Sequence, residues 1–316
     1  MSRPLPTGTP DDASTTSTST RDGTDERTVD LPTGVQICYQ TFGDAADEVM
    51  LLVMGLGGPM TWWDTDLCRL LADAGFFVVR YDNRDAGRSS KLPGRVSRRA
   101  LVNGFVGRGG PPPYTLDDLA KDGLALLDHL GAASAHVVGV SMGGMIAQTM
   151  AVLHPDRVRS LTSISSTTGR RSVGWQDPRL LPLLLARSEA TRDAYVATST
   201  RMWRVIGSPG YPETVEDVRV RAGDTFDRGV SPSGVGRQML AIVRQPDRSH
   251  RLSGLRMPTL VIHGLDDKLV HVSGGRATAA AIPGSELVLV PGMGHDLPVQ
   301  LHRMFVDAIT RVARRS

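Results

Sequence analysis

The sequence of 316 residues predicts an α/β fold built on a mostly parallel, doubly wound sheet. Three observations lead to this fold class. Short β-rich runs alternate with amphipathic helical stretches from about residue 35 onward, which is typical of chains that place helices on both faces of a sheet. Most of these runs are unbroken aliphatic stretches, the pattern of parallel strands covered on both faces. The chain is also long enough for one large domain of this kind, or for two ordinary ones.

The expected strands are spread over most of the chain. The sequence predicts them at residues 35–42, 49–54, 76–82, 136–141, 158–163, 259–263 and 286–290. Helices are expected between them. One should begin after an N-cap at Thr115, continue to about Leu130 and end at Gly131. A final helix is expected at residues 298–315, where arginines near its C-terminus would complement the helix dipole.

The alternation of strands and helices stops between residues 167 and 252. This stretch has the pattern of helices and loops and lies between two core strands, so we expect a helical cap there. The core should then comprise residues 29–166 and 253–316. Residues 1–28 are rich in Thr, Ser, Asp, Gly and Pro and have no aliphatic periodicity. We expect a disordered tail there, because such a segment buries too little apolar area to offset its ordering entropy.

Composition and charge argue against several classes of protein. The net charge is only +3, and the arginines are interspersed with Asp and Glu instead of clustered, so no nucleic-acid partner is expected. No apolar run is long enough to cross a membrane, and no membrane span is expected. No basic segment followed by an apolar one stands near the N-terminus, so a cytoplasmic location is expected. No cluster of metal ligands is visible, and neither a metal nor an organic cofactor is expected.

The strongest local signal is the sequence Gly139-Val140-Ser141-Met142-Gly143, between an expected strand and an expected helix. A serine held at a sharp strand-to-helix turn has a strained backbone, and a Cβ at either glycine would collide with neighbouring elements. A glycine-rich turn with an N-capping serine would explain only one of the two glycines. Ser141 is therefore the candidate nucleophile.

His295 is the candidate base among eight histidines. It follows the last expected strand, in a loop whose two glycines let the imidazole reach over the C-terminal edge of the sheet, near Ser141. The acid is expected at the end of another parallel strand, between nucleophile and base in chain order. The strand at 259–263 leads into Asp266 and Asp267, and the pattern alone does not separate them. In either case the carboxylate would fix the histidine tautomer and stabilise the imidazolium.

Five segments resemble those of α/β-hydrolase esterases, at residues 52–58, 80–89, 139–144, 263–267 and 292–295. They are most similar to bacterial members such as the aclacinomycin methylesterases and lipolytic esterases, and the resemblance covers about residues 35–310. It implies the α/β-hydrolase fold, with a helical cap inserted between core strands. It also implies Asp267 as the acid, because the family's acid is the last residue of a His-Gly-x-x-Asp pattern.

The same resemblance implies an oxyanion hole formed by the backbone N–H groups of Leu56 and Met142. Met54 stands where many relatives carry histidine. The resemblance implies hydrolysis through a Ser-His-Asp triad and an acyl-enzyme, and we expect a carboxylic ester of a mainly apolar small molecule as the substrate. A serine at position 141 argues against dehalogenase and epoxide-hydrolase chemistry, which on this fold uses a carboxylate nucleophile.

Several alternatives stay open. The same triad would serve a thioesterase, a lactonase, a C–C bond hydrolase or a perhydrolase, and a chain that kept the fold without turnover would be a ligand-binding protein. The large cap side chains suggest a mainly apolar substrate, although packing within the cap is the alternative for each; they are Leu183, Leu184, Leu185, Trp203 and Met239. The sequence predicts no oligomeric state.

Overall fold

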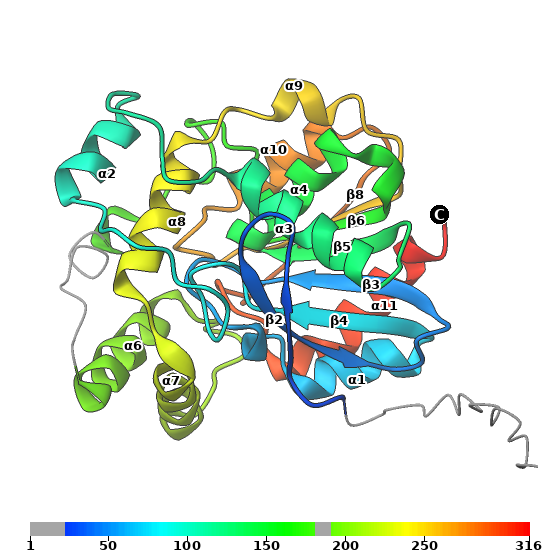
Figure 1. Cartoon of the computed structure of the whole chain (residues 1–316), viewed down its shortest axis with the longest axis horizontal. Helices are drawn as coiled ribbons and strands as arrows, with labels where there is room; N and C mark the ends of the chain where they lie inside the picture. Colours follow the sequence, from blue (N-terminus) through cyan, green and yellow to red (C-terminus); the bar gives the residue numbers. More distant parts are fainter. Residues whose placement is uncertain (1–22, 181–190) are drawn as a thin grey trace, which may run out of the picture.

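The computed structural model describes residues 23–180 and 191–316 (Figure 1). Eight strands form one sheet in the order β1-β2-β4-β3-β5-β6-β7-β8. The ladders from β4 to β8 are all parallel, whereas β1 and β2 pair antiparallel at one edge. The strands are β1 (Arg27–Asp30), β2 (Gln36–Phe42), β3 (Glu48–Val53), β4 (Phe76–Tyr81), β5 (Ala135–Val140), β6 (Val158–Ile164), β7 (Thr259–Gly264) and β8 (Glu286–Val290).

The seven expected strands correspond to β2–β8, and each of their ends lies within one residue of the prediction. The mostly parallel sheet confirms the predicted fold class. β1 was not expected and begins inside the residues assigned to a disordered tail. It is only four residues long and three of its side chains are exposed, so it carries no aliphatic pattern. It becomes a strand through its ladder with β2.

Helices cover both faces of the sheet (Figure 1). α1 (Thr65–Asp73) and α11 (His302–Ala313) lie on one face, and α3 (Leu116–His129), α4 (Met142–Leu153) and α10 (Ser273–Ala281) lie on the other. A cluster of buried, mainly aliphatic side chains fills the space on each face. These two layers explain why the central strands are apolar without alternation.

The ends of two helices test the predictions at single residues. Thr115 caps α3 as expected, in a capping box: its Oγ1 accepts the Asp118 N–H, and the Asp118 carboxylate accepts the Thr115 N–H. Gly131 follows the helix with a φ of +70°. The last helix begins later than expected, because residues Val299–Leu301 form a 3-10 turn before α11.

Between β6 and β7 the described chain is helical and irregular. It contains α6 (Arg192–Ile206), α7 (Val215–Gly229), α8 (Pro232–Arg244) and the short α9 (Ser249–Leu252). We call α6, α7 and α8 the cap. α2 (Arg98–Phe105), from the chain between β4 and β5, packs against α8 (Figure 1). Across residues 23–180 and 191–316, no helix has the length and apolar character needed to cross a bilayer.

Candidate active site

The turn from β5 to α4 holds Ser141 in an unusual backbone conformation, with φ 57° and ψ −120°. L-residues rarely adopt this region, and it occurs mostly where surrounding structure enforces it. A Cβ on Gly139 would lie 2.1 Å from the Gly143 carbonyl oxygen, and one on Gly143 would lie 2.0 Å from that of Val53. Both glycines of the motif are therefore required by close backbone approach.

The structure brings Ser141, His295 and Asp267 together at the carboxyl edge of the sheet. Ser141 Oγ lies 2.9 Å from His295 Nε2, and His295 Nδ1 lies 2.7 Å from Asp267 Oδ2. Both His295 and Asp267 are buried. In this arrangement one imidazole nitrogen can accept the hydroxyl proton of the serine while the other is held by a carboxylate.

The two neighbouring aspartates occupy different environments. Asp267 Oδ1 accepts the backbone N–H groups of Leu269 and Val270, at 2.9 and 2.8 Å, which leaves Oδ2 for His295. Asp266 is exposed, and its carboxylate accepts the N–H of Gly292 instead. The structure thus places Asp267, and not Asp266, against the histidine.

Electrostatics keep Asp267 ionised. Burial alone would raise the pKa of this carboxyl, but the charge of His295 and the hydrogen bonds of His263 and His295 outweigh burial and lower the pKa below its ordinary value. The side chain is therefore a carboxylate at neutral pH, as the partner of a histidine that gains a proton must be.

The two expected oxyanion donors lie beside the serine. Met142 is the first residue of α4, so its N–H has no acceptor within the helix. Leu56 lies in the turn after β3, and a Cβ on Gly55 would be only 3.2 Å from Ser141 Cβ. Within the described chain, no backbone acceptor takes the N–H of Leu56 or Met142. Neither N–H group is thus engaged by the backbone of the described residues.

A cavity of about 240 Å³ opens onto Ser141 and His295. Its other walls are largely apolar and come from the end of β5, the loops after β3 and β7, the cap and the loop of His295; they are Met54, Gly55, Leu56, Trp62, Val140, Ser199, Met202, Trp203, Ile206, Arg221, Leu269, Asp296 and Leu297. Trp203 lines it, as suggested from the sequence, and packs edge to face on Trp62. Met239 is not part of this lining, and Leu183, Leu184 and Leu185 lie outside the described residues.

Two polar groups of this cavity are marked by no sequence motif. Arg221 lies over the Trp203 ring, 4.9 Å from its centroid, and pairs with Glu213. Asp296 accepts hydrogen bonds from the hydroxyl and the N–H of Ser208, and burial raises its pKa. Arg221 reaches the cavity only through the packing of α7, which no local pattern reveals. Asp296 has one usable signal, its position next to His295.

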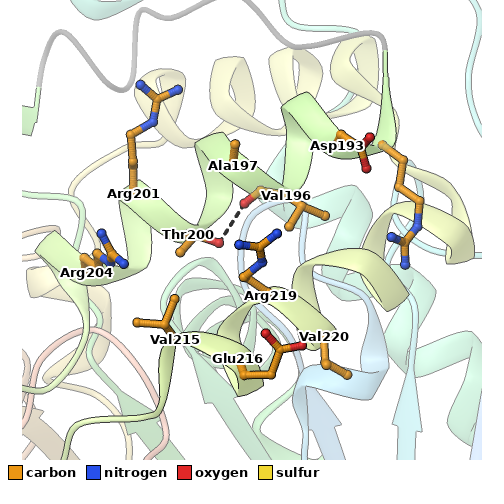
Figure 2. Close-up of a pocket in the computed structure, with 11 residues that line it drawn as sticks. Asp193, Val196, Ala197, Thr200, Arg201, Arg204, Val215, Glu216, Arg219 and Val220 are labelled. Atoms are coloured by element: carbon orange, nitrogen blue, oxygen red, sulfur yellow. Dashed lines mark hydrogen bonds between the residues drawn. The ribbon is translucent and has the colours of Figure 1, made fainter.

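A second hollow, of about 510 Å³, lies between α6 and α7, and charged side chains surround it (Figure 2). The one hydroxyl among its described lining residues belongs to Thr200, which donates to the Val196 carbonyl oxygen at 2.7 Å. No histidine stands among those lining residues to activate it. The arrangement suited to nucleophilic chemistry is therefore the one at Ser141.

Known proteins resemble this chain over most of its length. Rhodomycin D methylesterase DauP of Streptomyces sp. (strain C5) is 30% identical over 302 residues, which cover 87% of this chain and 94% of that protein. Rhodomycin D methylesterase DnrP of Streptomyces peucetius is 29% identical over 300 residues, with the same coverage of 87% and 94%. A crystal structure of a hydrolase from Pseudomonas aeruginosa PA01 has a TM-score of 0.69 at 26% identity, over 91% of this chain and 98% of that one.

A family model also matches. It is described as the alpha/beta hydrolase fold, and it covers residues 48–300 of this chain. The resemblance inferred from the five sequence segments is thereby confirmed, and so is the expectation of a hydrolase. The chain belongs to the alpha/beta hydrolase family.

Proposed function

We propose that this hydrolase cleaves carboxylic esters of mainly apolar small molecules through a Ser141–His295–Asp267 triad and an acyl-enzyme. The observation that carries the proposal is the hydrogen-bonded chain from Asp267 to Ser141, which ends in a largely apolar cavity. The methylesterase names of the two Streptomyces relatives favour an ester as the substrate.

In the first step, Ser141 Oγ attacks the ester carbonyl carbon while its proton moves to His295 Nε2. The carbonyl oxygen becomes an oxyanion and accepts hydrogen bonds from the Leu56 and Met142 N–H groups. Such donors are already oriented before the reaction begins, so they stabilise the oxyanion without first having to reorganise. The Asp267 carboxylate stabilises the imidazolium that forms.

In the second step, the tetrahedral intermediate collapses and His295 gives its proton to the departing alcohol. The acyl group stays on Ser141 as an ester. A water molecule then transfers a proton to His295 and attacks the acyl carbon, and the proton returns to Ser141 Oγ as the acid leaves. Each cycle consumes one ester and one water and releases one alcohol and one acid.

The test is hydrolysis of p-nitrophenyl esters, acetate through decanoate, by the wild type and by Ser141→Ala. We expect kcat/KM to fall by about a thousandfold or more in the variant, because the nucleophile is gone while substrate binding remains. Ser160→Ala is the matched control, since this serine is buried in β6, bonds to His136 and is not part of the cavity lining. It should keep most of the activity.

Two results would overturn the proposal. The first is equal ester turnover by the wild type and Ser141→Ala. The second is a wild type that turns over no ester and whose Ser141 is not labelled by a fluorophosphonate, which would favour a ligand-binding role. If esters are cleaved, the chain-length optimum gives the length of acyl group that the cavity accepts.

A further inference from the structure

Leu56 lies in a four-residue turn, residues 55–58, whose type is set by the orientation of its central peptide. The Gly58 N–H donates to the Gly55 carbonyl oxygen at 3.2 Å, which makes Leu56 and Gly57 the two central residues of a four-residue turn. Gly57 has a φ of +65°. A positive φ at this third position is the mark of a type II turn, which differs from type I in the orientation of the peptide between the two central residues.

A cap side chain holds that central peptide. Gln238 lies on α8 and is fully buried, and its Oε1 accepts the Gly57 N–H at 2.7 Å. Its Nε2 donates to the carbonyl oxygen of Arg84, in the loop after β4, at 2.8 Å. Both ends of the amide are therefore used, and each ties the cap to a core loop.

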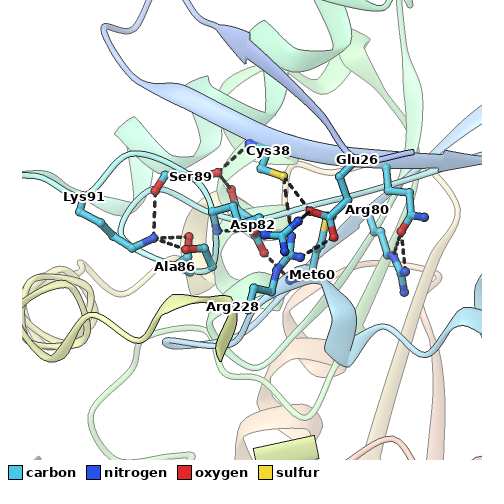
Figure 3. A network of polar contacts seen from close by, with 12 residues as sticks. Glu26, Cys38, Met60, Arg80, Asp82, Ala86, Ser89, Lys91 and Arg228 are labelled. Carbon is cyan, nitrogen blue, oxygen red and sulfur yellow. Dashed lines mark hydrogen bonds and ion pairs between the residues drawn. The ribbon is translucent and has the colours of Figure 1, made fainter. Parts of the chain in front are cut away.

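Other side chains hold only the two ends of the segment. Asn83 Nδ2 donates to the Met54 carbonyl oxygen at 2.9 Å, and Asp82 Oδ1 accepts the Met60 N–H at 2.6 Å (Figure 3). Among the described residues, Gln238 is the one side chain that hydrogen-bonds to the backbone of residues 55–58. The middle of the turn therefore depends on the cap.

The position of Gln238 is itself fixed. The neighbouring Arg237 is buried and binds both carboxylate oxygens of Asp85, each at 2.7 Å. Asp85 also accepts the Tyr114 hydroxyl at 2.7 Å. This part of α8 is thus anchored to the loop after β4, and the amide of Gln238 is presented to the turn from a rigid support.

We propose that Gln238 is a positioning residue for the oxyanion hole: by anchoring the Leu56–Gly57 peptide, it fixes the place of the turn, and with it the preceding Gly55–Leu56 peptide, whose N–H is the expected donor beside Ser141. The catalytic consequence rests on the proposed function, whereas the positioning of the turn does not. Loss of the Gln238 bond leaves the turn without its side-chain anchor, so that the turn can shift as a whole and carry the Leu56 N–H away from the oxyanion. Because the oxyanion exists in the transition state and not in the bound ester, the loss should lower kcat more than it raises KM.

The decisive variants are Gln238→Met and Gln238→Glu. Methionine keeps the approximate length of the side chain but accepts no strong hydrogen bond, and we expect kcat to fall about ten- to hundredfold with KM changed by less than about threefold. Glutamate keeps an acceptor for the Gly57 N–H, and its protonated form, which burial favours, also keeps a donor to Arg84. It should recover the larger part of kcat.

Gln148→Met is the matched control. Gln148 is equally buried and is hydrogen-bonded to Ser163 and Arg248, and none of its hydrogen bonds reaches the turn. Its substitution removes the same chemical group from the core and should change kcat by less than about twofold. A general loss of packing would affect both methionine variants alike.

Amide hydrogen exchange gives a readout that needs no substrate. Exchange at Gly57 should be faster in Gln238→Met than in the wild type and unchanged in Gln148→Met. Unchanged exchange at Gly57 in Gln238→Met overturns the inference, whether or not kcat falls. Faster exchange with an unchanged kcat, in an enzyme that does cleave esters, overturns it too. If the wild type cleaves no ester, the proposed function fails, and faster exchange would still support the positioning of the turn.

Discussion

The sheet and the cap are held in place by different kinds of contact. Between the sheet and its covering helices, mainly aliphatic side chains form two large buried clusters. The cap adds buried polar side chains that reach into core loops, chiefly Arg228, Arg237 and Gln238. Aliphatic contacts tolerate small shifts in position, whereas hydrogen-bonded ions and amides require particular distances and angles.

Arg228 shows this most clearly. From α7 it reaches Asp82 at 2.7 Å and also pairs with Glu26, next to the Cys38 thiol (Figure 3). Asp82 in turn accepts the N–H of Met60, so one cap arginine is linked through one carboxylate to the loop that follows β3. The polar side chains of the cap therefore fix core loops, among them the loop after β3 that lines the cavity at Ser141.

The largest effect is expected in the core, at the acid. Asp267→Asn should lower kcat by about 10⁴-fold, because an amide favours the wrong histidine tautomer and cannot stabilise the imidazolium. Asp266→Asn is the neighbouring control, since that side chain is exposed and contacts Gly292 instead of His295. Ester kinetics on both variants measure the difference, and similar losses in the two would refute the assignment of Asp267.

The next effect tests the cap. Arg237→Met should lower the free energy of unfolding by about 3–5 kcal/mol, because it leaves Asp85 as a buried charge without its cation. Urea denaturation at neutral pH measures the loss. Arg192→Met removes an exposed pair with Asp227 and should leave stability unchanged. Equal effects of the two substitutions would mean that the buried pair is not what secures the cap.

The same pair predicts a dependence on pH. Burial would raise the pKa of Asp85, but its hydrogen bonds with Arg237 and Tyr114 outweigh burial and lower the pKa. A carboxyl with a lowered folded-state pKa adds stability above its unfolded value, about 3.9, and loses it as the pH falls through the folded-state pKa. The unfolded-state pKa is common to both proteins, so the stability difference between wild type and Arg237→Met should shrink as the pH falls from the folded-state pKa of Asp85 in the variant, which loss of the cation raises, to the lower pKa in the wild type.

The sequence predicts features of the core better than it predicts the contacts between the cap and the core. The core strands and the serine turn are set by neighbouring residues: aliphatic runs give the strands, and backbone crowding requires Gly139 and Gly143. The choice between Asp266 and Asp267 needed either a resemblance or the geometry. The pattern of acidic residues is the same for both, and only the amides of the next turn distinguish them.

The cap contacts could not be predicted in this way. Gln238 and Gly57 are 181 residues apart, and Arg237 and Asp85 are 152 apart. The residues next to a helical glutamine or arginine do not show whether its side chain is buried or exposed. β1 was missed for a related reason, because a short strand with exposed side chains is defined by its neighbour. The cap contacts thus join residues far apart in the sequence, and β1 depends on its pairing with the next strand, so a local pattern reveals neither.

A smaller effect is expected where the cap lines the cavity. Trp203→Ala removes an aromatic contact with Trp62 and widens the cavity. We expect kcat/KM for short esters to fall by about tenfold and the chain-length optimum to move to longer acyl groups. Trp175→Ala is the control, because it removes a half-exposed indole that stacks on His271, outside the cavity. An identical optimum in wild type and Trp203→Ala would exclude Trp203 from the acyl site.

The smallest effect is expected when the same substitution, threonine to alanine, is made at a helix N-cap in the core and at one in the cap. Thr115 caps α3 of the core, and Thr214 caps α7 of the cap, through the same bond to the third helical N–H. Thr115→Ala should lower the free energy of unfolding by about 1 kcal/mol. Thr214→Ala should lower it less, because the first turn of α7 is exposed and can fray without disturbing the buried contacts of Arg228. Urea denaturation of both variants decides: equal losses would mean that the end of α7 unfolds only with the core, so that the cap is as rigid as the sheet it covers.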